Sequence, residues 1–174
     1  MKNLNTLKLV TAVALAMGFG GAQAATAFPA SMTASVSVAS SCTLTGGAPF
    51  AFSPYTSGQQ VHSYATSTVT ANCSNMTAYS VGIDRGAYLS AAAGFPGFRA
   101  LSTGAPGQAL GYEIRALNQG GQQWGDGGHT INFAAYAGTG SGAAQVIPAV
   151  GIIFGGQAAT SGNYNDQVTV TLTY

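Results

Sequence analysis

Residues 31–40 have the sequence SMTASVSVAS, in which apolar and polar side chains alternate. A period of two predicts a β-strand with one apolar face. The even-numbered apolar pattern continues back to Phe28, so the segment would span about 35 Å at about 3.3 Å per residue, whereas strands usually have about 5–6 residues. A long strand with a clean apolar face aggregates unless it is paired. We therefore expect it to pair, either with its own domain or with a second molecule. The apolar positions are Phe28, Ala30, Met32, Ala34, Val36 and Val38.

The first 24 residues have the pattern of a secretory signal peptide. Lys2 and Lys8 precede or flank a short apolar run over residues 9–19, and Ala22-Gln23-Ala24 matches a cleavage site. The run is too short for a membrane-spanning helix. We predict cleavage after Ala24, an N-terminal extension over residues 25–40, and one domain over residues 41–174.

Few residues of the predicted mature chain are charged. After Ala24 there are three arginines and four acidic residues, a formal net charge of −1. This excludes a row of phosphate contacts and hence a nucleic-acid partner, and no later segment is suited to membrane insertion. Charged residues make up 5% of the whole chain, against roughly a quarter in ordinary domains. A surface with so little repulsion is suited to packing against other copies.

The only two cysteines, Cys42 and Cys73, predict one disulfide in an exported protein. Closing a loop of this length stabilises a fold by roughly 3.5–4 kcal/mol in the chain-entropy model. A metal site needs further ligands, and His62 and His129 have no suitable spacing. We expect neither a metal nor a cofactor.

Alternation with a period of two continues along the rest of the chain and predicts an all-β sandwich with Gly-rich connections. In the segment at residues 109–116, Leu110, Tyr112 and Ile114 are expected in the core. In AVGIIF, Val150, Ile152 and Phe154 share a face. The expected strands lie within residues 67–73, 78–84, 109–116, 149–154 and 166–174.

No group of residues predicts catalysis, so we expect no catalytic residue and no enzyme activity. Asp126 lies between glycines and Asp166 precedes the last strand, and turn chemistry accounts for both. Trp124 is expected to pack over the end of the sandwich, with a ligand-stacking platform as the alternative.

Several segments resemble the spore coat protein U domain family, which includes the pilins of archaic chaperone–usher pili. They are PFAFSPYTSG, STVTANCSN, ALGYEIRA, WGDG and the ending GQAATSGNYNDQVTVTLTY. The resemblance implies an incomplete immunoglobulin-like β-sandwich that lacks one strand. It also implies that the missing strand leaves a hydrophobic groove, which a periplasmic chaperone fills first. At an outer-membrane usher, the N-terminal donor strand of the next pilin subunit then replaces the chaperone.

The expected function is therefore a structural subunit of an extracellular fimbria that contributes to surface attachment or biofilm formation. Residues 28–38 would be the donor strand. The terminal strand would border the acceptor groove through Val168, Val170, Leu172 and Tyr174. Two alternatives stay open: a spore-coat or cell-envelope protein of the same family, and a monomeric carbohydrate-binding module whose first strand pairs with its own domain.

Overall fold

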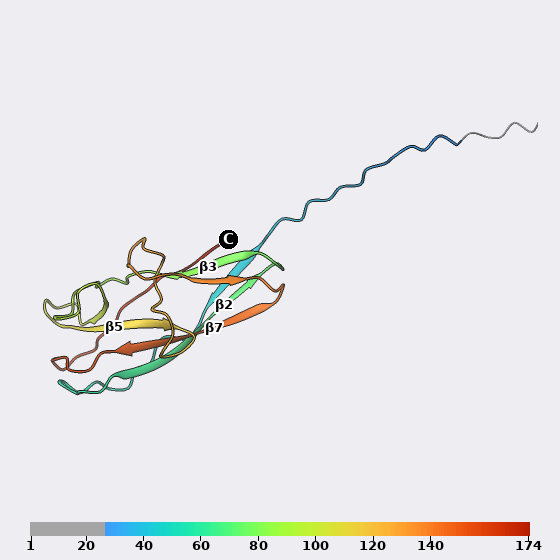
Figure 1. Ribbon diagram of the computed structural model, residues 1–174. Coiled ribbons are helices and arrows are strands. Elements are labelled where there is room, and N and C mark those ends of the chain that lie inside the picture. The colour runs from blue at the N-terminus through green and yellow to red at the C-terminus, as the bar shows by residue number, and fades with distance from the viewer. Residues whose placement is uncertain (1–26) are drawn as a thin grey trace, which may run out of the picture. The chain divides into compact units, whose positions relative to one another are not determined.

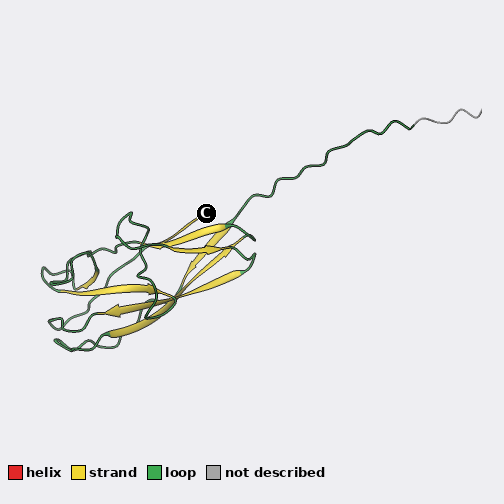
Figure 2. Cartoon of the chain, viewed as in Figure 1, coloured by secondary structure: helices red, strands yellow, loops and turns green. Residues whose placement is uncertain are grey.

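The computed structural model describes residues 27–174, and the predicted signal peptide lies outside the described residues. The described part is all-β, with two antiparallel sheets and no helix (Figure 1, Figure 2). Residues 27–174 accordingly contain no helix able to cross a membrane. The strands are β1 (Cys42–Gly46), β2 (Ser63–Cys73), β3 (Ala78–Ile83), β4 (Arg99–Ser102), β5 (Ala109–Ala116), β6 (Tyr136–Thr139), β7 (Ala144–Ile153) and β8 (Val170–Thr173).

The larger sheet has the strand order β1-β2-β7-β5-β4. Its centre is the long pairing of β2 with β7, which runs from Ser63↔Ile153 to Asn72↔Ala144. Val, Ile and Thr dominate these strands, as expected for a pleated, half-buried surface. Alternate residues of each strand face the core, among them Val69, Ala71 and Cys73 from β2. The predicted inward positions of β5, Leu110, Tyr112 and Ile114, are all buried.

The smaller sheet has the order β6-β3-β8 and packs its apolar face on the same core. Tyr79, Val81 and Ile83 of β3 are buried there. Trp124 is completely buried and donates its indole Nε1–H to the Val81 carbonyl oxygen at 2.7 Å. Trp124 therefore lies within the core, and a ligand-stacking role is wrong because its rings are covered.

Cys42 and Cys73 form the predicted disulfide, with an S–S distance of 2.02 Å. The two cysteines also face each other as the first pair of the β1–β2 ladder. Cys42 begins β1 and Cys73 ends β2. The cross-link therefore lies at the end of β1 where the N-terminal segment enters the domain.

Val150, Ile152 and Phe154 share one face of the sheet, as predicted, but that face is not the one that packs on the main core. Ile147, Ala149 and Ile153 belong to the core cluster, so the intervening Val150 and Ile152 face the other side of the sheet. They are nevertheless buried. Phe154 follows on that side and stacks on Phe95 at 4.7 Å, because the segment before β4 folds over the sheet. A strand buried on both faces loses the alternation that would reveal its orientation.

The strands belong to a unit of residues 38–174, and residues 27–37 precede it. Residues 27–40 contain no strand, and every one of them is exposed. Phe28 is 87%, Met32 97% and Val36 89% exposed, and Val38 at the start of the folded unit is 87% exposed. The predicted strand over residues 28–38 is thus not a strand of the domain as described.

Candidate strand-binding groove

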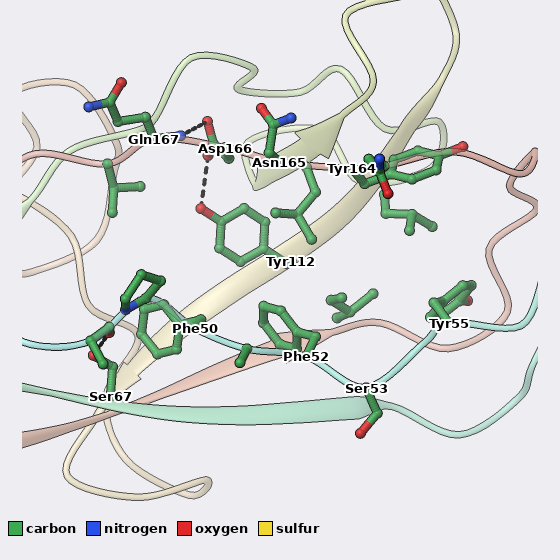
Figure 3. Close-up of a pocket in the computed structure, with 18 of the residues that line it drawn as sticks. Phe50, Phe52, Ser53, Tyr55, Ser67, Tyr112, Tyr164, Asn165, Asp166 and Gln167 are labelled. Atoms are coloured by element: carbon green, nitrogen blue, oxygen red, sulfur yellow. Dashed lines mark hydrogen bonds between the residues drawn. The ribbon is translucent and has the colours of Figure 1, made fainter.

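A groove of about 1020 Å³ opens on one side of the core (Figure 3). Its floor contains Leu110 and Tyr112 of β5 with Ala149 and Ile153 of β7. Its first wall is the segment 47–55, which follows β1, and its second wall is the segment 159–170, which leads into β8. The side chains that face it are mostly apolar. They include Phe50, Phe52, Tyr55, Leu101, Ala159, Tyr164, Val168 and Val170.

The first wall is an extended segment that has left the sheet. β1 pairs with β2 as far as Gly46↔Val69. The next contact is the bond from the Ser67 hydroxyl to the Ala48 carbonyl oxygen at 2.5 Å. Gly47 is required there, because a Cβ on it would lie 2.1 Å from the Thr68 carbonyl oxygen. Tyr55 closes the far end, where its hydroxyl accepts the Gln157 N–H at 3.0 Å.

Phe50 and Phe52 point from the first wall into the groove, on the opposite side from Tyr112 (Figure 3). Their rings lie 6.3 Å apart and rest on Gly151 of β7. A Cβ on Gly151 would lie 2.7 Å from Phe52 Cζ and 3.0 Å from Phe50 Cδ1. The glycine therefore makes the space in which both rings fit beside the floor.

The second wall has one paired edge and one open edge. Asn165 exchanges both backbone hydrogen bonds with Ser102 of β4, and Asp84 donates its N–H to the Thr169 carbonyl oxygen. Backbone groups of successive residues in a strand point to opposite edges, so Tyr164, Asp166 and Val168 present theirs to the groove. Within residues 27–174, the N–H groups of these three residues have no hydrogen-bond partner. Residues 50–53 of the first wall likewise donate no backbone hydrogen bond within the described chain.

Open backbone edges on both sides of an apolar trough are the features that an added strand would need. Buried N–H and C=O groups are nearly always paired in folded proteins. A ladder to each wall would satisfy them, while alternate apolar side chains of the added strand would cover the floor. The geometry thus fits an extended peptide better than a compact small molecule.

Asp166 joins the second wall to the floor. Tyr112 donates its hydroxyl to Asp166 Oδ2 at 2.8 Å (Figure 3), and the Ala87 N–H donates to Oδ1 at 2.8 Å. Asp166 thus makes long-range contacts in addition to the local turn contact expected, which is the Gln167 N–H bond at 2.9 Å. Gly86 makes the approach possible, because a Cβ there would lie 2.1 Å from Asp166 Oδ2.

Burial is the largest cause of the pKa shifts of Asp166, Tyr112 and Arg99 at this end of the groove. Desolvation raises the pKa of Asp166, although hydrogen bonds from Ala87, Tyr112 and Gln167 partly oppose it. Desolvation, followed by the charge of Asp166, raises the pKa of the Tyr112 phenol far above its usual range. Arg99 is 1% exposed, and desolvation lowers its pKa. Its Nε–H and Nη2–H groups donate to the Asp84 and Ile83 carbonyl oxygens, both at 2.7 Å.

The predicted acceptor residues divide into two pairs. Val168 and Val170 line the groove, whereas Leu172 and Tyr174 do not. Leu172 packs on the core instead, and Tyr174 is 60% exposed. The first wall and Tyr164 were not predicted as parts of the groove, although the alternation in PFAF at residues 49–52 and the nearby Tyr55 were signals of the wall. The Tyr164 hydroxyl donates to the Thr160 carbonyl oxygen at 3.1 Å.

The residues considered for catalysis or metal binding, His62, His129 and Asp126, form no shared site within residues 27–174. His62 and His129 are both exposed, and they lie in separate loops. Asp126 accepts hydrogen bonds from the Thr130 and Ile131 N–H groups, as expected for a turn. Residues 27–174 contain no group of three or more His, Cys, Asp or Glu side chains that could hold a metal ion.

The family model of the Spore Coat Protein U domain matches residues 28–171 of this chain. The chain belongs to this family. The match begins at Phe28, so for a Spore Coat Protein U domain the extended N-terminal segment is part of the family pattern and not an addition to it.

One solved structure similar to this Spore Coat Protein U domain is titled as a pre-assembly complex from Acinetobacter baumannii. It contains the CsuC chaperone and the CsuE tip adhesion subunit of archaic chaperone-usher Csu pili. The TM-score is 0.54 at 20% sequence identity, which supports the fold. The match covers 79% of this chain and 40% of the chain in that structure. No curated protein matches the Spore Coat Protein U domain described here.

Proposed function

We propose that this chain is a structural subunit of an extracellular fibre in which residues 28–38 of one copy fill the groove of the next. The observation that supports this most is the combination of an open apolar groove with an exposed alternating segment on the same chain. The segment can span about 35 Å. The second wall from Tyr164 to Val170 can span about 20 Å by the same rise per residue.

The energetics favour a tight joint. Covering a Met or Val side chain contributes roughly 1.5–3 kcal/mol, and each new ladder hydrogen bond contributes about 1 kcal/mol net. Together these offset the entropy lost when the extension becomes ordered. The contact is head-to-tail between unlike surfaces, so repetition produces an open fibre instead of a closed ring.

We further propose a route of assembly, based on the family and on the similar structure, which is a complex of a chaperone with a pilus subunit. The subunit is exported to the periplasm, held there by a chaperone that lends a strand, and polymerised at an outer-membrane usher. The fibre then contributes to surface attachment or biofilm formation, with no catalytic step by this chain. Loss of surface fibres together with loss of attachment in a strain lacking this chain would support the cellular role.

The experiment that tests strand donation compares two variants of the same arm. Met32→Asp places a charge on the apolar face of the segment, whereas Thr33→Asp places the same charge on the polar face. We expect the mature chain with Thr33→Asp to form fibres in electron micrographs and the Met32→Asp chain to stay monomeric. Deletion of residues 28–38 should also abolish fibres. Fibres from the Met32→Asp chain, or from the deleted chain, would show that strand donation is wrong.

The same micrographs distinguish a fibre subunit from the two alternative functions. A spore-coat or cell-envelope protein of this family would coat the cell without forming filaments. A monomeric carbohydrate-binding module would remain monomeric with its extension intact. The groove supports neither alternative, since both of its walls carry backbone N–H groups without partners in residues 27–174, which an added strand would bond, and the extension is not part of either sheet.

A further inference from the structure

Hydrogen bonds and a disulfide hold the place where the N-terminal extension joins the domain. The Ser74 N–H donates to the Ser41 carbonyl oxygen at 2.9 Å, and the Ser41 N–H donates to Ser74 Oγ at 3.0 Å. Ser74 Oγ also lies 2.8 Å from Thr77 Oγ1. The Cys42–Cys73 disulfide follows directly in the chain. We call these five residues the arm root.

The arm root lies between the two parts of the chain that the proposed fibre would pull. The extension precedes it, and the first wall of the groove begins one residue after β1 ends at Gly46. Only residues 39–46, of which the last five form β1, therefore separate the donated strand of a subunit from the wall that receives the next strand. A pull on the extension acts along the chain toward that wall.

β1 resists such a pull poorly by hydrogen bonds alone. It is the edge strand of its sheet, and it pairs only with β2, over five residue pairs from Cys42↔Cys73 to Gly46↔Val69. A force applied at Ser41 would open this ladder one pair at a time, beginning at Cys42. The first wall would follow as far as Tyr55, whose hydroxyl is bonded to Gln157, because the Ser67–Ala48 bond is the one hydrogen bond between this wall and β2 within residues 27–174.

We propose that the arm root is a mechanical stop that keeps tension on the extension from reaching the groove wall. The disulfide lies at the first pair of the ladder, so the pull passes through a covalent bond into β2 before any β1 hydrogen bond is loaded. β2 is held on its other edge by ten residue pairs with β7 in the middle of the sheet. The Ser41–Ser74 bonds strengthen the same point. This inference rests on the proposed fibre.

A single-molecule experiment tests the stop without a fibre. One mature chain is pulled between its N-terminus and Tyr174, first oxidised and then after reduction with a phosphine. Only the reduced chain should show an additional early step of roughly 50 Å, the extended length of residues 42–55. The double variant Cys42→Ser/Cys73→Ser should show this step with or without reductant. It is a complete control because the chain has no other cysteine. An identical first step in oxidised and reduced chains would overturn the proposal.

Preassembled fibres provide the second test. Reduction of a fibre held under tension should lower its rupture force, whereas reduction of a fibre at rest should release no subunits. Release at rest would show that the disulfide maintains the groove's shape, and the mechanical role would be wrong. In a reduced fibre, Ser74→Ala should lower the rupture force further, because the Ser41–Ser74 bonds are then the first to bear the pull. Ser141→Ala, which removes an exposed hydroxyl that donates to the Ala143 carbonyl oxygen, is its control. Failure of the proposed function itself is seen separately, as fibres that survive Met32→Asp.

Discussion

The Tyr112 hydroxyl on β5 lies 2.8 Å from Asp166 Oδ2, and 54 residues separate the two along the chain. The bond fixes the second wall of the groove to its floor at the point where the wall's backbone is open toward the groove. Asp166 also accepts the Ala87 N–H, so one carboxylate holds three segments together. The Tyr112–Asp166 bond is the side-chain contact between this wall and the floor, beside the backbone pair that Asn165 forms with Ser102 of β4.

Removal of that contact should destabilise the domain. We expect Tyr112→Phe to lower the free energy of unfolding by about 1–3 kcal/mol, because a half-buried carboxylate loses a hydrogen-bond donor. Urea denaturation of the mature chain measures the change. Tyr88→Phe is the matched control, since the Tyr88 hydroxyl has no hydrogen-bond partner within residues 27–174, and it should leave the midpoint unchanged. Equal midpoints for the two variants would contradict a role for the Tyr112–Asp166 bond.

The raised pKa of Asp166 predicts an unusual dependence of stability on pH. Between the ordinary carboxyl pKa near 4 and the raised value, the folded chain binds more protons than the unfolded chain. The contribution of Asp166 is therefore fully present at lower pH and is lost as pH rises through its folded pKa. Asp166→Asn should remove this fall. The difference in unfolding free energy between wild type and Asp166→Asn, measured across the acid range, should shift in favour of the variant as pH rises.

Asp126 should behave in the opposite way within the same titration. Burial opposes ionisation of its carboxyl, but hydrogen bonds from Thr130 and Ile131 outweigh burial and lower its pKa. Its contribution is present above the ordinary carboxyl pKa and is lost as pH falls through the lowered value. Asp126→Asn should therefore lose stability at neutral pH and approach wild type in acid. The same sign of pH dependence for both variants would contradict this account of the two carboxyls.

Gly151 should control binding of the donated strand. Gly151→Ala brings a methyl group against Phe50 and Phe52, whose rings line the groove and must shift to admit it. We expect the variant's groove to bind a synthetic peptide of residues 28–38 at least about tenfold more weakly, a change of about 1.4 kcal/mol. Titration calorimetry measures the affinity. Gly120→Ala is the control, because its Cβ would meet only Asn118 Oδ1 at 3.5 Å, and equal affinity for the two variants would contradict the argument.

Assembly should be almost independent of salt. Arg85 is the one exposed charged side chain among residues 27–174, since the other six are half-buried or buried. Salt screens exposed charges most strongly. We therefore expect the rate of fibre growth, followed by light scattering, to change less than about twofold between low and physiological ionic strength. Arg85→Ser should abolish any remaining effect of salt on the growth rate. A steep effect of salt on both the wild-type and the Arg85→Ser chain would show that charges other than Arg85 steer assembly.

Local alternation predicted much of this protein correctly. The inward faces of β2, β3 and β5 follow from a period of two, because each of these strands buries one face in the common core. The disulfide follows from two cysteines in a chain with a predicted export signal. Alternation failed at β7, whose second face is covered by the segment that carries Phe95, since a strand buried on both sides has no polar face to mark its orientation.

The extension and the groove depended on different kinds of information. The apolar face of residues 28–38 is a property of consecutive residues, and the sequence by itself determined it, including its unusual length. The groove is assembled from segments 47–55, 109–116 and 159–170, which only the tertiary structure brings together. Its critical contacts, Tyr112 with Asp166 and Phe52 with Gly151, join residues about 50 to 100 positions apart. No local pattern encodes such contacts, because they depend on how the strands are ordered in the two sheets.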